Sequence, residues 1–238
     1  MAVVEWKKDE TVAIITMNTA ENRHNPDFAK GMLGAFDAIE QDEEIKSIVL
    51  ASSSEKAWSL GIDLTWIMGA MTNNELDSIR EFMYDMNNVF KKALMIPMPV
   101  IAAMNGHTFG NGSILACSCD YRFMKADRGF FCFPEVDINI PFLPSMLATM
   151  KKAIPYYKLE EIVFSGKRVG AKEMEEHHMV VKACENADAL MKEAVEYAKT
   201  YQKGRKIFNE HKTRLHKHII EIMEKEDPEF IEPLNLMV

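Results

Sequence analysis

The feature that most constrains the fold is a central stretch in which an apolar strand leads through glycines into an apolar helix. The sequence PVIAAMNGHTFGNGSILACSCD (residues 99–120) holds a buried-type strand at 100–104, the glycine triplet Gly110-Asn111-Gly112 and a helical segment at 113–117. A strand that delivers its backbone to a helix N-terminus leaves N–H groups without intrahelical partners. Glycine also lets a ligand approach the main chain closely. The stretch therefore predicts a site for an anion or a developing oxyanion.

Two common phosphate-binding motifs do not fit this stretch. The glycine order is G-x-x-x-G-x-G, and no acidic residue ends a following strand at the interval that a dinucleotide fingerprint requires. No Gly-Lys-Ser/Thr follows, as a P-loop would need. The sequence therefore argues against a nucleotide site of either kind.

The segments around this stretch predict a mixed α/β front and a helical tail. Residues 3–7 and 12–17 alternate as a β-hairpin, and Asn25 is expected to cap a helix with Pro26 at its first position. Helical crossovers between strands favour parallel pairing. Further strands are expected at 47–51, 121–124 and 130–133, a second amphipathic helix at 76–94, and only helices after Pro141, at 146–153, 156–164, 187–201 and 207–223.

Composition excludes several classes of protein. Of the 238 residues, 47% are hydrophobic, which supports a full core, and the net charge of −8 argues against a nucleic-acid partner. No apolar run approaches the ~20 residues needed to span a bilayer. Residues 1–8 do not read as a signal peptide, and Leu236-Met237-Val238 is not a peroxisomal address. We therefore expect a cytoplasmic protein with no membrane partner and with reduced cysteines.

Taken together, four segments resemble the crotonase superfamily, the enoyl-CoA hydratases and isomerases. They are VAIITMN at 12–18, AWSLGIDL at 57–64, PVIAAMNG at 99–106 with its following triplet, and CDYR at 119–122. The resemblance covers about residues 3–203. It implies an α/β fold, a crotonase-like spiral of ββα units with a helical C-terminal region. We expect the spiral core at 1–185 and a region for oligomerisation and pocket cover at 186–238, assembled as a homotrimer or a dimer of trimers.

The same resemblance assigns an oxyanion hole. In this family two backbone N–H groups hold the thioester oxygen of an acyl-CoA, and here they would come from Ile62 and Asn111. The family usually has glycine at the second position, so Asn111 is a departure; asparagine tolerates left-handed geometry better than most residues. The implied substrate is an acyl-CoA, with coenzyme A as part of the thioester and no separate cofactor.

The acids distinguish between the reactions of the family. Hydratases use two glutamates, and the position of the first is Ile114, which cannot transfer a proton. The second is present as Glu135, and the run 127–138 looks especially like the plant-type monofunctional isomerases. The resemblance places substrate contacts on the two loops and near them, at Arg23, His24, Ser59, Leu60, Gly61, Asp63, Leu64, Gly110 and Ile114, with Arg23, His24 and Lys56 where relatives contact the CoA phosphates and adenine.

One base is enough for an allylic isomerisation. The expected reaction shifts the double bond of a 3-enoyl-CoA to give the 2-enoyl-CoA, with Glu135 as the single acid and base. Burial among Trp66, Ile114, Phe133 and Ile140 is expected to raise the pKa of Glu135. The alternatives that stay open are other enolate chemistry (an acyl-CoA or diketone hydrolase, a decarboxylase or a weak hydratase) and a non-catalytic acyl-CoA binder.

The remaining histidines and cysteines predict structure rather than chemistry. His177-His178 and the set His211, His216 and His218 lack an accompanying carboxylate motif, so we expect solvated helix faces and no metal. Cys117 and Cys119 are expected to pack inside a helix, and His107 to pack or to form a hydrogen bond beside the second loop.

Overall fold

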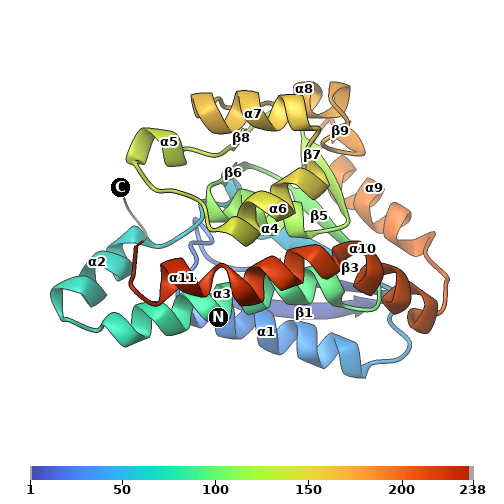
Figure 1. Cartoon of the computed structure of the whole chain (residues 1–238). Coiled ribbons are helices and arrows are strands. Elements are labelled where there is room, and N and C mark those ends of the chain that lie inside the picture. Colours follow the sequence, from blue (N-terminus) through green and yellow to red (C-terminus); the bar gives the residue numbers. More distant parts are fainter. Residues whose placement is uncertain (1, 236–238) are drawn as a thin grey trace.

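A six-stranded sheet forms the centre of the computed structural model, which describes residues 2–235 (Figure 1). The first two strands form an antiparallel hairpin, and every later strand is parallel to its neighbour. In spatial order the strands are β1 (Val4–Asp9), β2 (Val12–Met17), β3 (Ser47–Ser52), β5 (Val100–Met104), β7 (Tyr121–Lys125) and β9 (Lys182–Cys184).

A second, smaller sheet carries three short parallel strands. These are β4 (Ala57–Ser59), β6 (His107–Phe109) and β8 (Phe131–Cys132). Each follows a strand of the large sheet along the chain, and a helix then leads on to the next large-sheet strand. This repeated order confirms the expected spiral of ββα units.

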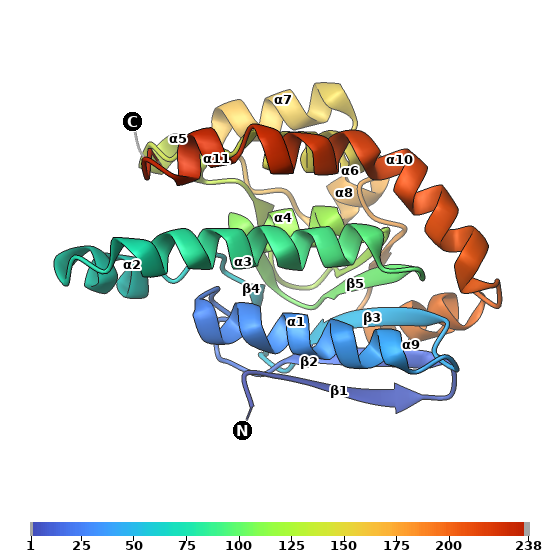
Figure 2. The same ribbon diagram turned by 60° about the horizontal axis from the view of Figure 1, so that its bottom comes forward.

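Helices cover both faces of the large sheet, because both sets of alternate side chains are apolar. Ala13 and Ile15 point to a core shared with α1, α3 and α4, whereas Val12 and Ile14 point to α9. The long helices α1, α3 and α10 run side by side (Figure 2). The bounds are α1 (Pro26–Gln41), α2 (Leu64–Thr72), α3 (Leu76–Met95), α4 (Asn111–Ser118), α5 (Glu135–Ile138), α6 (Pro144–Ala153), α7 (Tyr156–Ser165), α8 (Ala171–Glu176), α9 (Ala187–Lys199), α10 (Arg205–Lys225) and α11 (Pro228–Ile231).

The expectation of an all-helical tail is wrong at one point. Residues 182–184 form β9, which pairs in parallel with β7 at the edge of the large sheet. The strand is only three residues long, and its partner fixes it rather than any periodicity of its own. The same reason explains why the sequence did not predict β4 and β6.

The C-terminal region contributes to two different layers. The α9 side chains Leu190, Ala194 and Ala198 are fully buried on the large sheet, so this helix completes the sheet packing. Helix α10 instead packs against α3 and α6. The division at 185/186 remains a prediction, and Leu236-Met237-Val238 lies outside the described residues.

Within residues 2–235, no helix is both long enough and apolar enough to cross a membrane.

Candidate active site

The three strands of the small sheet end at one edge, and this edge assembles the site. Because β4, β6 and β8 are parallel, the residues that follow them meet there. Residues 60–63 follow β4, Gly110 and Asn111 follow β6, and Glu135 follows β8. The structure therefore brings together the two loops and the acid that lie far apart in the sequence.

The two loops touch through their glycines. Gly61 has φ of 77°, and a Cβ placed on it would lie 2.8 Å from the Phe109 oxygen and 2.9 Å from the Asn111 nitrogen. A Cβ on Gly112 would lie 2.6 Å from the Ser59 oxygen. Such distances leave no space for a side chain, so only glycine allows this approach of the two backbones.

The backbone N–H groups of Ile62 and Asn111 are available as donors. Asn111 is the first residue of α4, where an N–H has no intrahelical acceptor. The residues on either side of Ile62 form hydrogen bonds with the backbone of His24. The His24 N–H donates to the Gly61 oxygen at 2.7 Å, and the Asp63 N–H donates to the His24 oxygen at 2.9 Å. Neither Ile62 nor Asn111 donates its own N–H to any residue in 2–235. Two free donors beside the Gly61 contact suit a developing oxyanion.

Glu135 lies against the second loop with one oxygen unpaired. It is the first residue of α5, and a Cβ placed on Gly110 would lie 3.1 Å from its Oε1. Its Oε2 is buried and has no hydrogen-bond partner among residues 2–235. Burial raises the pKa of Glu135 to about 7, although a hydrogen bond from its own backbone N–H acts to lower the pKa. A carboxyl group with such a pKa can both accept and return a proton near neutral pH.

Ile114 is 1% exposed and belongs to the main apolar core. Phe133 belongs to the same cluster and Trp66 packs against it, and the Ile140 N–H donates to the Glu135 backbone oxygen at 3.1 Å. Position 114 therefore offers only an aliphatic side chain, which cannot transfer a proton.

The residues expected to bind substrate occupy several different environments. Ser59 is buried, Leu60 is half-buried and donates its N–H to Glu21, and Leu64 is exposed at the start of α2. The Asp63 carboxylate accepts from the N–H groups of Thr65 and Trp66 and caps that helix.

The two basic side chains beside the first loop differ from each other. Arg23 is half-buried, forms an ion pair with Glu21 at 2.6 Å and donates to the Ile62 oxygen at 3.4 Å. His24 has no exposed surface, so its imidazole is closed off from solvent, and its expected contact with substrate stays a prediction. Its ring packs on Phe28 of α1, with ring centroids 4.2 Å apart.

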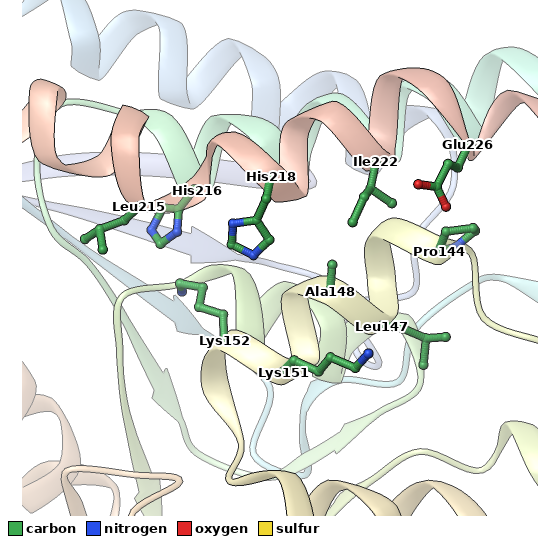
Figure 3. Close-up of a pocket in the computed structure, with 10 residues that line it drawn as sticks. All are labelled: Pro144, Leu147, Ala148, Lys151, Lys152, Leu215, His216, His218, Ile222 and Glu226. Carbon is green, nitrogen blue, oxygen red and sulfur yellow. The ribbon is translucent and has the colours of Figure 1, made fainter.

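Beyond the site, His216 corrects the expectation of a solvated face. It is 7% exposed, and burial together with the Lys152 charge lowers the pKa of His216 to about 4. It lines a hollow of about 630 Å³ between α6 and α10, together with Lys151, Lys152 and His218 (Figure 3). The residues of the candidate active site do not line this hollow.

The cysteines and His107 pack as expected. Cys117 and Cys119 are fully buried in and beside α4, and burial raises the pKa of Cys117 to about 11 and of Cys119 to about 12. The His107 ring packs against the rings of Phe109 and Phe130, with centroids 5.2 and 5.8 Å away. Among residues 2–235, no three His, Cys, Asp or Glu side chains are placed to hold a metal ion together.

Sequence reasoning missed Asn22 beside the first loop. It is fully buried with φ of 46°, and its amide donates to Ser52 Oγ at 2.8 Å and to the Trp58 oxygen at 2.9 Å. These bonds fix the start of the first loop, and the only signal in the sequence is the tolerance of asparagine for left-handed backbone.

Comparison with known proteins agrees with this geometry. A family model described as enoyl-CoA hydratase/isomerase matches residues 7–229. Enoyl-CoA delta isomerase 2, peroxisomal, of Arabidopsis thaliana is 30% identical over 73% of this chain and 72% of its own. A short-chain-enoyl-CoA hydratase of Clostridium acetobutylicum is 30% identical over 81% and 72%.

The fold agrees as well. The crystal structure of an enoyl-CoA hydratase from Bacillus halodurans superposes with a TM-score of 0.86 at 19% identity, over 97% of this chain and 94% of that one. The chain therefore belongs to the enoyl-CoA hydratase/isomerase family, the crotonase superfamily.

Proposed function

We propose that the protein is a Δ3,Δ2-enoyl-CoA isomerase. The observation that carries the proposal is a single acid, Glu135, beside two free backbone donors, with buried hydrocarbon at Ile114 where a hydratase has its other glutamate. The similarity to the plant delta isomerases supports the proposal. A hydratase is equally similar in sequence, at 30% identity, so only an activity measurement distinguishes the two reactions.

In the proposed mechanism Glu135 removes a proton from C2 of the 3-enoyl-CoA. The electron pair moves into the carbonyl, and the resulting enolate oxygen accepts hydrogen bonds from the N–H groups of Ile62 and Asn111. Glu135 then returns a proton to C4, and the double bond forms between C2 and C3. Each preorganised donor of this kind contributes ~10²–10³ in rate.

The deciding experiment offers the purified protein 3-enoyl-, 2-enoyl- and 3-hydroxyacyl-CoA in deuterated water, with the products analysed by mass spectrometry. Isomerisation exchanges hydrogen for deuterium without adding the mass of a water, whereas hydration adds both. We expect conversion between the two enoyl isomers and no formation of 3-hydroxyacyl-CoA. Hydration at a rate close to isomerisation would contradict the proposal.

Glu135→Gln tests the role of the base. The amide keeps the size of the side chain but cannot accept the C2 proton, so we expect isomerisation to be abolished while binding of the acyl-CoA stays nearly intact. Asp137→Asn is the matched control, because Asp137 is exposed on the same short helix. Full activity of Glu135→Gln would refute the assignment, and tight binding without turnover by the unmodified protein would favour the non-catalytic alternative.

We further propose that the protein assembles as a trimer or a pair of trimers through its C-terminal helices. The resemblance to the family supports this, and on α10 the side chain of Leu215 is 66% exposed at the hollow of Figure 3. Light scattering is expected to give a multiple of three times the 27.2 kDa chain mass. A monomer at micromolar concentration would contradict this proposal and leave the reaction untouched.

A further inference from the structure

One buried imidazole joins the two loops of the candidate oxyanion hole. His24 Nε2 lies 2.9 Å from Ser59 Oγ, which precedes Ile62 on the first loop. His24 Nδ1 lies 3.0 Å from Nδ2 of Asn111, the donor residue of the second loop. His24 has no exposed surface. The side chain therefore bridges segments that contribute one donor each.

The hydrogen bonds around the imidazole define its tautomer. The nitrogen of a side-chain amide can donate hydrogen bonds but cannot accept them, so Asn111 Nδ2 donates and His24 Nδ1 accepts. The proton of the neutral ring is then on Nε2, which donates to Ser59 Oγ. Ser59 gives its own proton to the Asn22 oxygen at 2.8 Å and accepts from the Gly61 N–H at 3.2 Å. The bonds thus run in one direction, from Asn111 through His24 to Ser59 and Asn22.

The ring is held in its neutral form by its surroundings. Complete burial lowers the pKa of His24 to about 3, so the ring stays uncharged at neutral pH. Its face stacks on Phe28 with an interplanar angle of 18°, which fixes its orientation. A neutral, oriented ring keeps Nδ1 available as an acceptor.

We propose that His24 is a positioning residue that holds the two halves of the oxyanion hole in register, and that it does so as a pair with Asn111. A glycine at position 111 would bring no side chain, whereas asparagine brings a buried amide that loses free energy if it lacks an acceptor. His24 supplies that acceptor and ties it to Ser59. The proposal depends on the proposed function in one respect only: it takes the oxygen bound in the hole to be the carbonyl oxygen of a thioester.

The test compares two ligands that differ at that oxygen alone. Octanoyl-CoA carries the thioester carbonyl, and the thioether S-octyl-CoA lacks it, so the ratio of their Kd values isolates the hole from the rest of the site. By calorimetry we expect the unmodified protein to bind the thioester more tightly. In His24→Leu we expect this preference to fall about tenfold or more, the equivalent of one lost buried hydrogen bond.

The pairing is tested by a double-mutant cycle. In the double variant His24→Leu/Asn111→Gly no buried amide is left unpaired, so we expect it to regain most of the preference that His24→Leu loses. His24→Asn, which keeps an acceptor near the Nδ1 position, is expected to retain more of the preference than His24→Leu, and it serves as the test if the leucine variant does not fold. The control is His107→Leu, since His107 packs beside the second loop and its Nδ1 has no partner among residues 2–235.

An unchanged thioester preference in folded His24→Leu and His24→Asn would overturn the proposal, as would simple additivity in the cycle. A ¹⁵N NMR spectrum that shows the His24 proton on Nδ1 would overturn it as well. If the protein prefers the thioester but does not isomerise 3-enoyl-CoA, the proposed function fails and the role of His24 stands.

Discussion

At the scale of single residues, the pKa of Glu135 links burial to the reaction. The carboxyl group has one unpaired, buried oxygen, and burial raises its pKa to about 7. The proton on C2 is removed only by the ionised form. A base whose pKa is near neutral pH also returns the proton readily, because the pKa of its conjugate acid is close to the pH of the solution.

The pH dependence of the rate follows from this value. Below a pKa of about 7 the fraction of ionised Glu135 falls tenfold per pH unit, so kcat/KM for 3-enoyl-CoA should be about 100-fold lower at pH 5 than on its plateau above neutrality. Initial rates measured from pH 5 to 9 provide the check. A profile that is flat through neutral pH would contradict a raised pKa for the base.

The same shift affects stability. The pKa of Glu135 in the folded protein, about 7, lies above its ordinary value of 4.5. As the pH rises, the unfolded chain therefore releases this proton first, and ionisation favours unfolding from about pH 4.5 upward. Glu135→Gln cannot ionise and should therefore be more stable than the unmodified protein by on the order of 3 kcal/mol above pH 7. The advantage should vanish below about pH 4.5, as denaturant unfolding at a series of pH values would reveal.

At the scale of elements, the site depends on short strands and tight loops. The long elements follow from periodicity: the stripe of Phe28, Met32 and Phe36 predicts α1, and all three side chains are fully buried. The strands β4, β6 and β8 span two or three residues, and only β8 lies in a segment, 130–133, for which the sequence predicts a strand. They exist because each pairs with the next, and their pairing aligns the two loops with Glu135.

Gly61→Ala tests this loop contact. The added Cβ would lie 2.8 Å from the Phe109 oxygen at a left-handed φ, so the two loops must separate and the two donors lose their common target. We expect kcat/KM to fall by ~10² or more, as for the loss of one oxyanion donor.

The matched control is Gly69→Ala within α2, where no atom outside the adjoining helix backbone lies within 4 Å of the new Cβ and alanine favours the helix. Activity close to normal in Gly61→Ala would show that the loops do not form the hole.

At the scale of the whole molecule, one buried ion pair joins the long helix α10 to the residue that precedes β7. Lys212 on α10 lies 2.9 Å from Asp120 Oδ2, and the same oxygen accepts from the Val100 N–H at 2.8 Å. The lysine also donates to the carbonyl oxygens of Ala93 and Met98. Its side chain is 3% exposed, so this is an interior contact between segments that are distant in the sequence.

Lys212→Met should lower the free energy of unfolding by ~3–5 kcal/mol, because it leaves a largely buried carboxylate without its cation. Chemical denaturation measures the loss. Lys217→Met on the same helix is the control: its side chain is 73% exposed, and exposed ion pairs contribute ~0–1 kcal/mol. Equal effects of the two substitutions would show that α10 is not anchored at Lys212.

By itself the sequence determined the family, because the glycine triplet, the apolar strands and Glu135 in its motif are local signals, and through the resemblance to that family it implied the ββα spiral. It did not determine β9, the buried position of His216 or the bridge that His24 makes between Ser59 and Asn111. Those depend on contacts between segments far apart in the chain. Pattern and propensity act over a few residues, whereas burial and hydrogen bonding are decided only when the sheets and helices pack.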